Sequence, residues 1–176
     1  MAILYPLQND DPKPLQPTGE FAHANFPESA HAVDFECPPG TAVVAADDGE
    51  IIFVKDDAPS DEAVTPQEYL NAKARGEEKQ LFAERTNLIG IRHHDDTYTE
   101  YIHLSQGSSS VKLGDKVRKG QVIATTALSG VMDKPHLHFN RFKVVEDDSG
   151  KRAESIPFEM VHTAREQVEE VLENLW

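Results

Sequence analysis

The stretch Lys134-Pro135-His136-Leu137-His138-Phe139 places two histidines on either side of one apolar residue. Successive side chains of a β-strand point to opposite faces, so His136 and His138 share one face while Leu137 and Phe139 share the other. Two neutral imidazoles make half of a zinc or copper site, because such sites need about three or four ligands. The simpler alternative is a strand with two half-exposed histidines and no metal. A metal site here requires further ligands from elsewhere in the chain.

Composition limits which partners and cofactors the chain can use. Its 176 residues suffice for one domain with a sizeable core. With 17 Lys and Arg against 31 Asp and Glu, the net charge is -14, which disfavours nucleic acids and anionic membrane surfaces as partners. Cys37 is the single cysteine, so an intrachain disulfide and a Cys-rich zinc cluster are excluded. Any metal would therefore be held by His and Asp.

The N-terminal stretch, residues 1–20, holds four prolines and few apolar residues, so we expect an extended arm laid over the main domain. It has no basic region ahead of its short apolar run, and we expect no secretory signal there. No segment approaches the roughly 18 consecutive apolar residues of a membrane-spanning helix. The sequence therefore predicts no membrane span.

From Ala32 onward, short apolar runs separated by turn residues predict β-strands. The first runs cover residues 32–35, 41–46 and 50–54. Asp48-Gly49 lies between the last two runs, and Asp-Gly in this setting is typical of a β-hairpin.

A second strand pair is predicted at residues 87–92 and 98–104, joined by a polar turn over His93-His94-Asp95-Asp96. We interpret both histidines of this turn as surface residues. His162, which precedes a predicted helix, is interpreted in the same way.

Between the two strand pairs lies an acidic, helix-compatible insertion at about residues 55–86. Thr65 and Glu68 have the spacing of a capping box, and Pro66 takes the first helical position. Gly76 is placed to end the helix one residue earlier. The sequence thus predicts an inserted helix.

A weak internal repeat supports a β fold. Residues 40–51 and 114–122 share a glycine-initiated turn, a short strand, a second glycine turn and another strand. This pattern predicts a mainly β fold, a compact antiparallel sheet or barrel-sandwich-like domain with an inserted helix and a C-terminal helix. The repeat also suggests the half-barrel of biotinyl and lipoyl carriers. Lys116 and Lys119 lack the Met-Lys or Asp-Lys-Ala setting of a carrier lysine, which disfavours that role.

The last segment, residues 146–176, is predicted to be an acidic turn and a helix that packs on the domain. Thr163 opens the helix, with Glu166 at capping-box spacing. The apolar residues of one stripe at helical period are Ala164, Val168, Val171, Leu172 and Leu175. This stripe indicates packing against a core or a partner and carries no chemistry.

Several segments, taken in order, resemble the lysostaphin/LytM-type zinc peptidases, peptidase family M23. They are Asp34-Phe35, Pro39-Gly40-Thr41 with Val43, Tyr101-Ile102-His103-Leu104, Gly114-Asp115-Lys116-Val117, Lys119-Gly120-Gln121 and Pro135-His136-Leu137-His138-Phe139. The resemblance covers roughly residues 21–142. It implies the duplicated hybrid motif fold, with a metallopeptidase domain over residues 21–145.

The resemblance also implies a role for each matched residue. It places Asp34 and His138 on a zinc ion, with His103 and His136 beside the metal as catalytic groups. Three protein ligands leave a fourth position for water, whose pKa zinc lowers towards about 7. His103 and His136 would then deprotonate that water and stabilise the oxyanion, because imidazole titrates near working pH.

The first zinc ligand departs from the family pattern, which sets a histidine four residues before the aspartate, where this chain has Ala30. His31 lies three residues before Asp34, and in an extended strand this spacing points the two side chains to opposite faces. A subgroup of the family has a longer loop with a Phe-Ser-His-like turn, which Phe21-Ala22-His23 resembles. We therefore favour His23 as the first zinc ligand and keep His31 as the alternative.

By resemblance, the substrate would be a peptide bond in the cross-bridges or stem peptides of bacterial peptidoglycan, cleaved by a monomer in the cell envelope. The high negative charge counts against a chain that must approach an anionic cell wall. The main alternative is a non-catalytic member of the family that binds a partner or a wall peptide.

Two other metal-binding classes are disfavoured by particular residues. A metal sensor or storage protein would not need His103 and His136 beside its metal. A cupin also places His-x-His on a strand but adds a glutamate a few residues later, and Asn140-Arg141-Phe142 supplies none.

Overall fold

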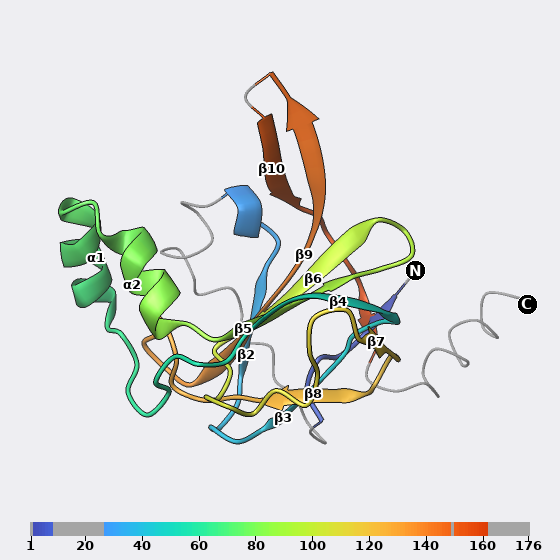
Figure 1. Ribbon diagram of the computed structural model, residues 1–176, viewed down its shortest axis with the longest axis horizontal. Helices are drawn as coiled ribbons and strands as arrows, with labels where there is room; N and C mark the ends of the chain where they lie inside the picture. The colour runs from blue at the N-terminus through green and yellow to red at the C-terminus, as the bar shows by residue number, and fades with distance from the viewer. Residues whose placement is uncertain (1, 9–26, 149, 162–176) are drawn as a thin grey trace, which may run out of the picture.

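Strands dominate the computed structural model, which describes residues 2–8, 27–148 and 150–161 (Figure 1). Two helices lie together at one side of the strands, and a long β-hairpin extends away from the body. The mainly β, antiparallel fold predicted from the sequence is confirmed, although the described strands do not close into a barrel.

The largest sheet has seven strands and holds the residues of interest. Its strands in spatial order are β10 (Gly150–Ser155), β9 (His136–Asp147), β6 (Thr97–Ile102), β5 (Leu88–Arg92), β4 (Gly49–Lys55) and β7 (Lys116–Val117), and β2 (Val33–Glu36) also pairs with β9. Each of these pairings is antiparallel. Because β9 pairs with β2, β6 and β10, it brings distant parts of the chain to one place. The predicted pair at residues 87–92 and 98–104 is confirmed as β5 and β6.

Two smaller sheets complete the described strands. In one of them, β3 (Ala42–Val44) pairs antiparallel with β8 (Val122–Thr125). In the other, β1 (Ile3–Leu4) pairs parallel with β11 (Met160–Val161), so the two ends of the described chain lie side by side. Ile3 and Tyr5 are buried in the core, which anchors the first described residues on the domain.

The core contains the apolar face of β9. Leu137 and Phe139 are both 0% exposed. The ring of Phe139 packs against that of Tyr101 on β6, with 5.2 Å between the ring centroids. Burying one such side chain contributes about 1.5–3 kcal/mol. The predicted alternation along β9 is therefore confirmed for its apolar positions.

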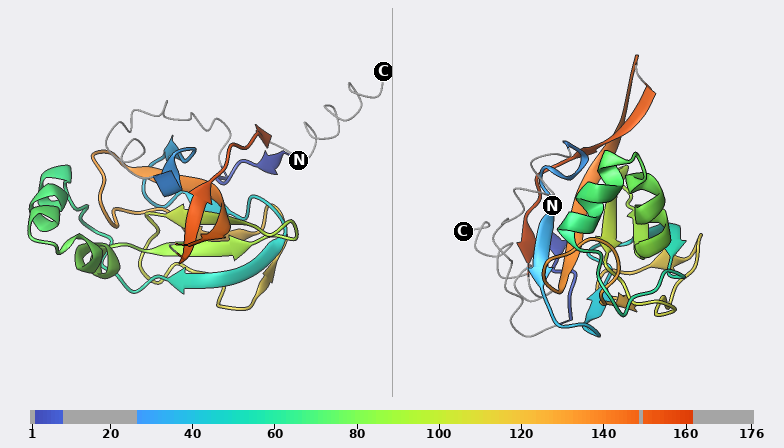
Figure 2. Two further views of the ribbon diagram at one scale, coloured as in Figure 1. Left: turned by 90° about the horizontal axis from the view of Figure 1, so that it is seen from above. Right: turned by 90° about the vertical axis from the view of Figure 1, so that its left-hand side faces the viewer.

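The insertion between β4 and β5 forms a helical hairpin of α1 (Pro66–Ala74) and α2 (Glu78–Arg85). As predicted, Thr65 and Glu68 form a capping box at the start of α1, and Gly76 follows its C-cap with φ +73°. The sequence predicted one helix and missed α2, because Glu77 provides no side-chain cap there. The two views in Figure 2 place this hairpin beside the sheet rather than on its face.

The predicted β-hairpin at Asp48-Gly49 is wrong. β3 pairs with β8, whereas β4 pairs with β5 and β7, so the strands flanking this dipeptide do not pair with each other. A Cβ atom at Gly49 would come within 2.5 Å of the carbonyl oxygen of Arg92. This glycine therefore allows close approach to β5 instead of forming a two-residue turn.

The segment after His136 contains more strand than the sequence predicted. β9 runs through to Asp147, and β10 and β11 follow it. The acidic turn lies between β9 and β10, where Asp147 pairs with Gly150. The predicted helix beginning at Thr163 lies outside the described residues, as do His162, His23 and residues 9–20 of the predicted arm.

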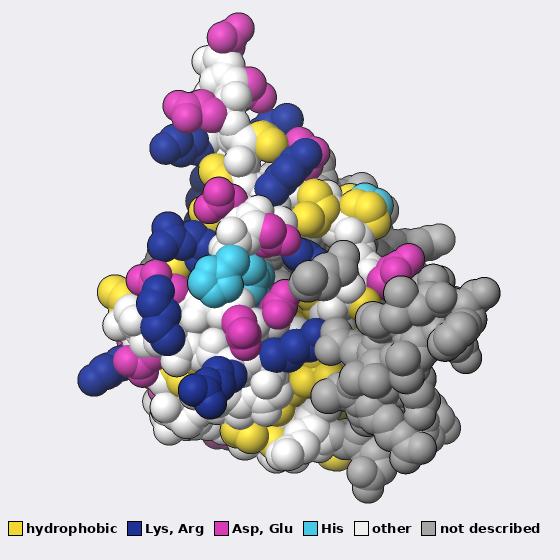
Figure 3. Space-filling view, turned by 90° about the vertical axis from the view of Figure 1, so that its right-hand side faces the viewer, with side chains coloured by type: hydrophobic (Ala, Val, Ile, Leu, Met, Phe, Trp, Pro, Cys, Tyr) yellow, Lys and Arg dark blue, Asp and Glu magenta, His cyan; other side chains and the backbone are white. Residues whose placement is uncertain are grey.

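The surface opposite the helices is shown in Figure 3, where acidic and basic side chains are interspersed and hydrophobic ones form small separate areas. Mixed charge of this kind is typical of a solvated face. None of the helices in the described ranges is long and apolar enough to cross a membrane.

Candidate metal centre

Strand pairing brings Asp34 next to both histidines of β9. Asp34 on β2 is the register partner of His138. Its Oδ1 atom lies 2.9 Å from Nδ1 of His138 and 3.7 Å from Nε2 of His136. The ring of His103, just after β6, lies 4.5 Å from that of His136 and 6.3 Å from that of His138, measured between centroids. The structure thus brings together four of the predicted site residues.

Backbone carbonyls fix the tautomers of His103 and His136. Nδ1 of His103 lies 2.6 Å from the carbonyl oxygen of Ser129, and Nδ1 of His136 lies 2.7 Å from that of Lys134. A carbonyl can only accept, so each Nδ1 donates and the neutral ring keeps its lone pair on Nε2. Within the described residues, neither Nε2 atom has a hydrogen-bond partner. Both imidazoles are therefore set to act as bases through Nε2.

His103 is held in an unfavourable backbone conformation. Its φ of +73° lies in the left-handed region, which costs a residue with a side chain about 1–3 kcal/mol. Its backbone N–H donates to the carbonyl oxygen of Asn87, and its carbonyl oxygen accepts from Ala127. Asn87 is itself fully buried, and its side chain bonds to Ala58 and Leu104. This framework imposes the strained conformation on His103.

Gly130 packs closely against Thr86 and the ring of His103. A Cβ atom at this position would lie 2.8 Å from Oγ1 of Thr86 and 3.2 Å from Nδ1 of His103. Gly130 also has φ +84°, which a side chain would oppose. Glycine is therefore required here, and Thr86 lies close to His103.

Burial and charge shift the histidine pKa values in opposite directions. Burial, reinforced by the neighbouring imidazoles of His136 and His138, holds the pKa of His103 well below its usual value. Burial would also lower the pKa of His138, but the hydrogen bond and charge of Asp34, with the charge of Glu100, raise it. His103 is accordingly neutral, as a base must be.

The donor types fit zinc, but the described residues supply only part of a site. Carboxylate and imidazole are zinc ligands, and two ligands at 2.0–2.1 Å on a tetrahedral ion are roughly 3.3 Å apart. The 2.9 Å between Asp34 and His138 is close to that spacing. Within residues 2–8, 27–148 and 150–161, no group of three or more His, Cys, Asp or Glu is arranged to hold a metal. A third ligand from this chain must therefore come from outside those ranges, or by movement within them.

His31 does not contact this centre in the structure. It is exposed and lies in the turn between the 3-10 helix η1 (Pro27–Ser29) and β2, so the strand alternation assumed for it does not apply. Its backbone N–H donates to Oγ of Ser155 at 3.0 Å.

A polar network that the sequence did not reveal fixes the segment before β2. The amide of Asn140 donates to Oε1 of Glu100 and to the backbone oxygen of Glu28, at 2.9 and 2.8 Å. Ser155 donates to Oδ1 of Asn140 at 2.8 Å and accepts from the His31 backbone. These bonds connect β6, β9 and β10 to the chain that leads into Asp34.

A cavity of about 540 Å³ opens beside the histidines. Its lining residues come from η1, the helical hairpin, β6, β9 and the loops around them, and are Glu28, Ser29, Tyr69, Lys73, Glu78, Lys79, Phe82, Thr86, Glu100, Ile102, His103, Val131 and His138. A substrate that filled this cavity would touch His103, His138 and the helical hairpin.

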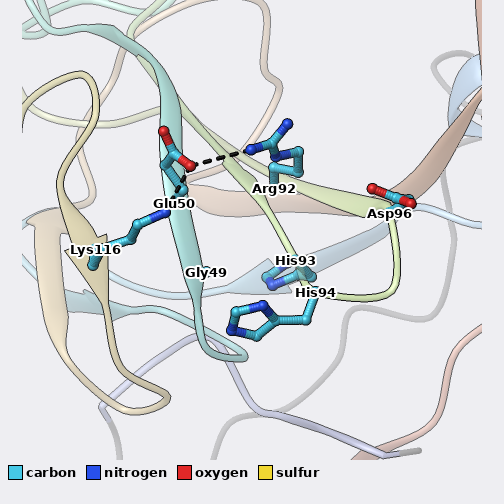
Figure 4. A pocket seen from close by; sticks show the side chains of 7 residues that line it. All are labelled: Gly49, Glu50, Arg92, His93, His94, Asp96 and Lys116. Carbon is cyan, nitrogen blue, oxygen red and sulfur yellow. Dashed lines mark hydrogen bonds and ion pairs between the residues drawn. The ribbon is translucent and has the colours of Figure 1, made fainter.

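A second pocket of about 240 Å³ surrounds His93 and His94 (Figure 4). Glu50 there pairs with Arg92 and Lys116, at 3.2 and 2.7 Å. The prediction that His93 is a surface residue is wrong, because it is 5% exposed, whereas His94 is exposed as predicted. Nδ1 of His93 lies 2.8 Å from the carbonyl oxygen of Asp48, and Nε2 lies 2.8 Å from Oγ1 of Thr99. The sequence could not show these partners, which come from other parts of the chain.

Comparison with known proteins identifies the class. The profile of peptidase family M23 matches residues 28–150, and the chain belongs to that family. It is 41% identical over 56 residues to the glycyl-glycine endopeptidase ALE-1 of Staphylococcus capitis, covering 31% of this chain and 15% of that protein. It is 28% identical over 133 residues to the peptidoglycan DD-endopeptidase ShyC of Vibrio cholerae, covering 74% of this chain and 23% of that protein.

A solved structure supports the fold. The crystal structure of a zinc-containing peptidase from Vibrio cholerae matches with a TM-score of 0.54 at 22% identity, covering 89% of this chain and 39% of that one. The chain thus spans less than a quarter of the length of either curated relative and about two fifths of the solved structure.

Proposed function

We propose that this chain is a zinc endopeptidase that cleaves a peptide bond in bacterial peptidoglycan. The observation that carries the proposal is the contact of Asp34 with His138, beside two imidazoles whose Nε2 atoms are open. Membership of peptidase family M23 supports it, and so do a glycyl-glycine endopeptidase and a peptidoglycan DD-endopeptidase among the relatives.

Zinc would be held by His23, Asp34 and His138. Bound zinc supplies a Lewis acid and lowers the pKa of water to about 7. The remaining steps belong to the protein. Nε2 of His103 accepts a proton from the attacking water, because burial keeps this ring neutral. Nε2 of His136 lies 3.7 Å from Oδ1 of Asp34, and from there the ring would help to stabilise the developing oxyanion.

His23 rather than His31 is proposed as the first zinc ligand. His31 is exposed, and its backbone is bonded to Ser155 on β10. We expect His23→Ala to lower zinc affinity sharply and His31→Ala to leave it within a few fold, as measured by zinc titration. The opposite ranking would make His31 the ligand.

The proposed setting is the cell envelope, with the chain acting as a monomer on peptidoglycan peptides. The charge of -14 opposes approach to an anionic wall, so binding would depend on short-range contacts in the cavity.

The test combines metal analysis with digestion of purified peptidoglycan and mass spectrometry of the fragments. We expect about one zinc per chain and new peptide termini, both of which disappear in His138→Ala. A His138→Ala protein that keeps full zinc under mild chelation would refute the ligand assignment.

A second candidate is a non-catalytic family member that binds a partner or wall peptide. It is favoured by one observation, that the described residues supply only Asp34 and His138 as contacting donors of the proposed ligand set. Unchanged zinc affinity in both His23→Ala and His31→Ala, with no fragments released by the unmodified chain, would support this candidate.

A further inference from the structure

The helical hairpin contributes little to the core of the protein. α1 buries only Ala72, and α2 buries none of its residues. Phe82 on α2 is nevertheless a large apolar side chain that remains 46% exposed. Helices in globular proteins are stabilised mainly by burying an apolar face, so core packing does not account for Phe82.

Phe82 instead lines the cavity that reaches the candidate metal centre. Ile102 on β6 and Val131 line the same cavity, as do His103 and His138. These three hydrocarbon side chains thus line one cavity together with both histidines, and we call them the apolar wall. Apolar walls with a few polar groups are typical of small-molecule and peptide sites.

Thr86 lies near both Phe82 of this wall and His103. α2 ends at Arg85, and Thr86 follows it with its backbone N–H bonded to the carbonyl oxygen of Phe82. Thr86 Oγ1 is buried without a hydrogen-bond partner among the described residues. Both this atom and Nδ1 of His103 lie next to Gly130. Thr86 is thus bonded to Phe82 through its backbone, while its side chain lies near His103 beside Gly130.

The charges of the cavity argue against a charged side chain as the occupant. Glu28, Glu78 and Glu100 line it together with Lys73 and Lys79, so neither sign dominates. An uncharged aliphatic side chain would gain contact with the wall without desolvating a charge.

We propose that Phe82, Ile102 and Val131 form a subsite for an aliphatic side chain of the substrate peptide next to the scissile bond. This subsite rests on the proposed peptidase function and deepens it. It selects peptides with side chains, such as alanine- or leucine-containing ones, over oligoglycine, which has no side chain to place on the wall.

The test uses Phe82→Ala with Phe53→Ala as a matched control. Phe53 on β4 is also 46% exposed, and it does not line the cavity. Each protein is loaded with zinc and given oligoglycine or a peptide of equal length with leucine beside the scissile bond. We expect the unmodified chain to prefer the leucine peptide, and Phe82→Ala to lose about tenfold in kcat/KM on it, mainly through KM. Oligoglycine cleavage and zinc content should not change.

A binding measurement separates this subsite from the peptidase proposal. Calorimetric titration of the zinc-free proteins with the leucine peptide should show weaker binding for Phe82→Ala only. Equal binding and kinetics for Phe82→Ala and Phe53→Ala, or a preference of the unmodified chain for oligoglycine, would overturn the subsite. A chain that cleaves neither peptide but binds leucine through Phe82 would refute the peptidase proposal and support the subsite.

Discussion

Two groups of buried histidines occupy different parts of this molecule, and their ring nitrogens are used differently. His93 is 5% exposed, and both its nitrogens are engaged, by the carbonyl of Asp48 and the hydroxyl of Thr99. His103 and His136 are each 7% exposed, and each makes its hydrogen bond through Nδ1 to a backbone carbonyl, while Nε2 of His136 also lies 3.7 Å from Oδ1 of Asp34. Burial alone therefore does not distinguish His93 from His103 and His136.

The number of ring nitrogens that have a hydrogen-bond partner does distinguish His93 from His103 and His136. The Nε2 atoms of His103 and His136 are not among the buried side-chain atoms without a partner in the described residues, so water or a ligand can reach them. His93 belongs to a chain of bonds that continues from Thr99 to the hydroxyl of Tyr101, which accepts the backbone N–H of Ala46 at 2.8 Å. Both ring nitrogens of His93 are thus hydrogen-bonded within the protein, whereas Nε2 of His103 has no hydrogen-bond partner among the described residues.

The largest expected effect comes from the open Nε2 atoms. His103→Ala and His136→Ala should each lower turnover by about a hundredfold or more, because each removes a general acid or base. Their zinc content at saturating zinc should match that of the unmodified chain, whereas His138→Ala should lose the metal. Turnover and metal analysis of the same preparations would measure this, and equal zinc loss in His136→Ala and His138→Ala would show that both bind the metal.

Substitution of His93 should lower the stability of the protein instead of its turnover. His93→Ala leaves the Asp48 carbonyl and the Thr99 hydroxyl without the ring, so we expect a loss of about 2–3 kcal/mol in the free energy of unfolding. Zinc content should not change. The adjacent exposed His94 provides the control, since His94→Ala should stay within about 0.5 kcal/mol in the same denaturant titration. A His93→Ala protein as stable as this control would contradict the structural role.

Protonation of His93 should also make the stability of the protein depend on pH. Burial lowers the pKa of His93 and outweighs the charges of Asp47 and Asp95, which raise it. Below about pH 6.5 the unfolded chain then binds a proton that the folded chain resists, so the free energy of unfolding falls by up to about 1.4 kcal/mol per pH unit. His93→Asn should lose less stability than the unmodified chain between pH 7.5 and 5.5. If the free energy of unfolding falls equally with pH in the two proteins, His93 is not the titrating group.

The smallest effect is expected at Thr86, whose Oγ1 atom is buried without a partner in the described parts of the chain. Thr86→Val keeps the shape and removes this hydroxyl, so stability should be unchanged or higher by up to about 1 kcal/mol. Thermal unfolding of the two proteins would measure the difference. A loss of more than about 1 kcal/mol would mean that the hydroxyl is bonded, for example to water.

Local patterns predicted those features that depend on neighbouring residues. The alternation of His136 to Phe139 predicted both the core face and the site face of β9, and the capping residues around Thr65 predicted α1. Resemblance to a family added Asp34 and His103, which the structure brings to the same place.

Features that depend on distant residues were not predictable in this way. The burial of His93 depends on Asp48 and Thr99, and Gly49 serves a close approach to β5 that no local pattern encodes. The network of Asn140, Glu100 and Ser155 joins three strands. The role of His23 stays a prediction.

Because side chains alternate along β9, burial of Leu137 and Phe139 in the core also fixes the strand register that places His136 and His138 at the site. A slip of one residue would send Leu137 and Phe139 to the cavity side and both histidines into the interior. Exposing two such apolar side chains costs about 3–6 kcal/mol, which keeps a slipped strand below about one molecule in a hundred. Any substitution that loosens the core beneath β9 would thus also disturb the candidate metal centre, even at a distance from Asp34 and His138.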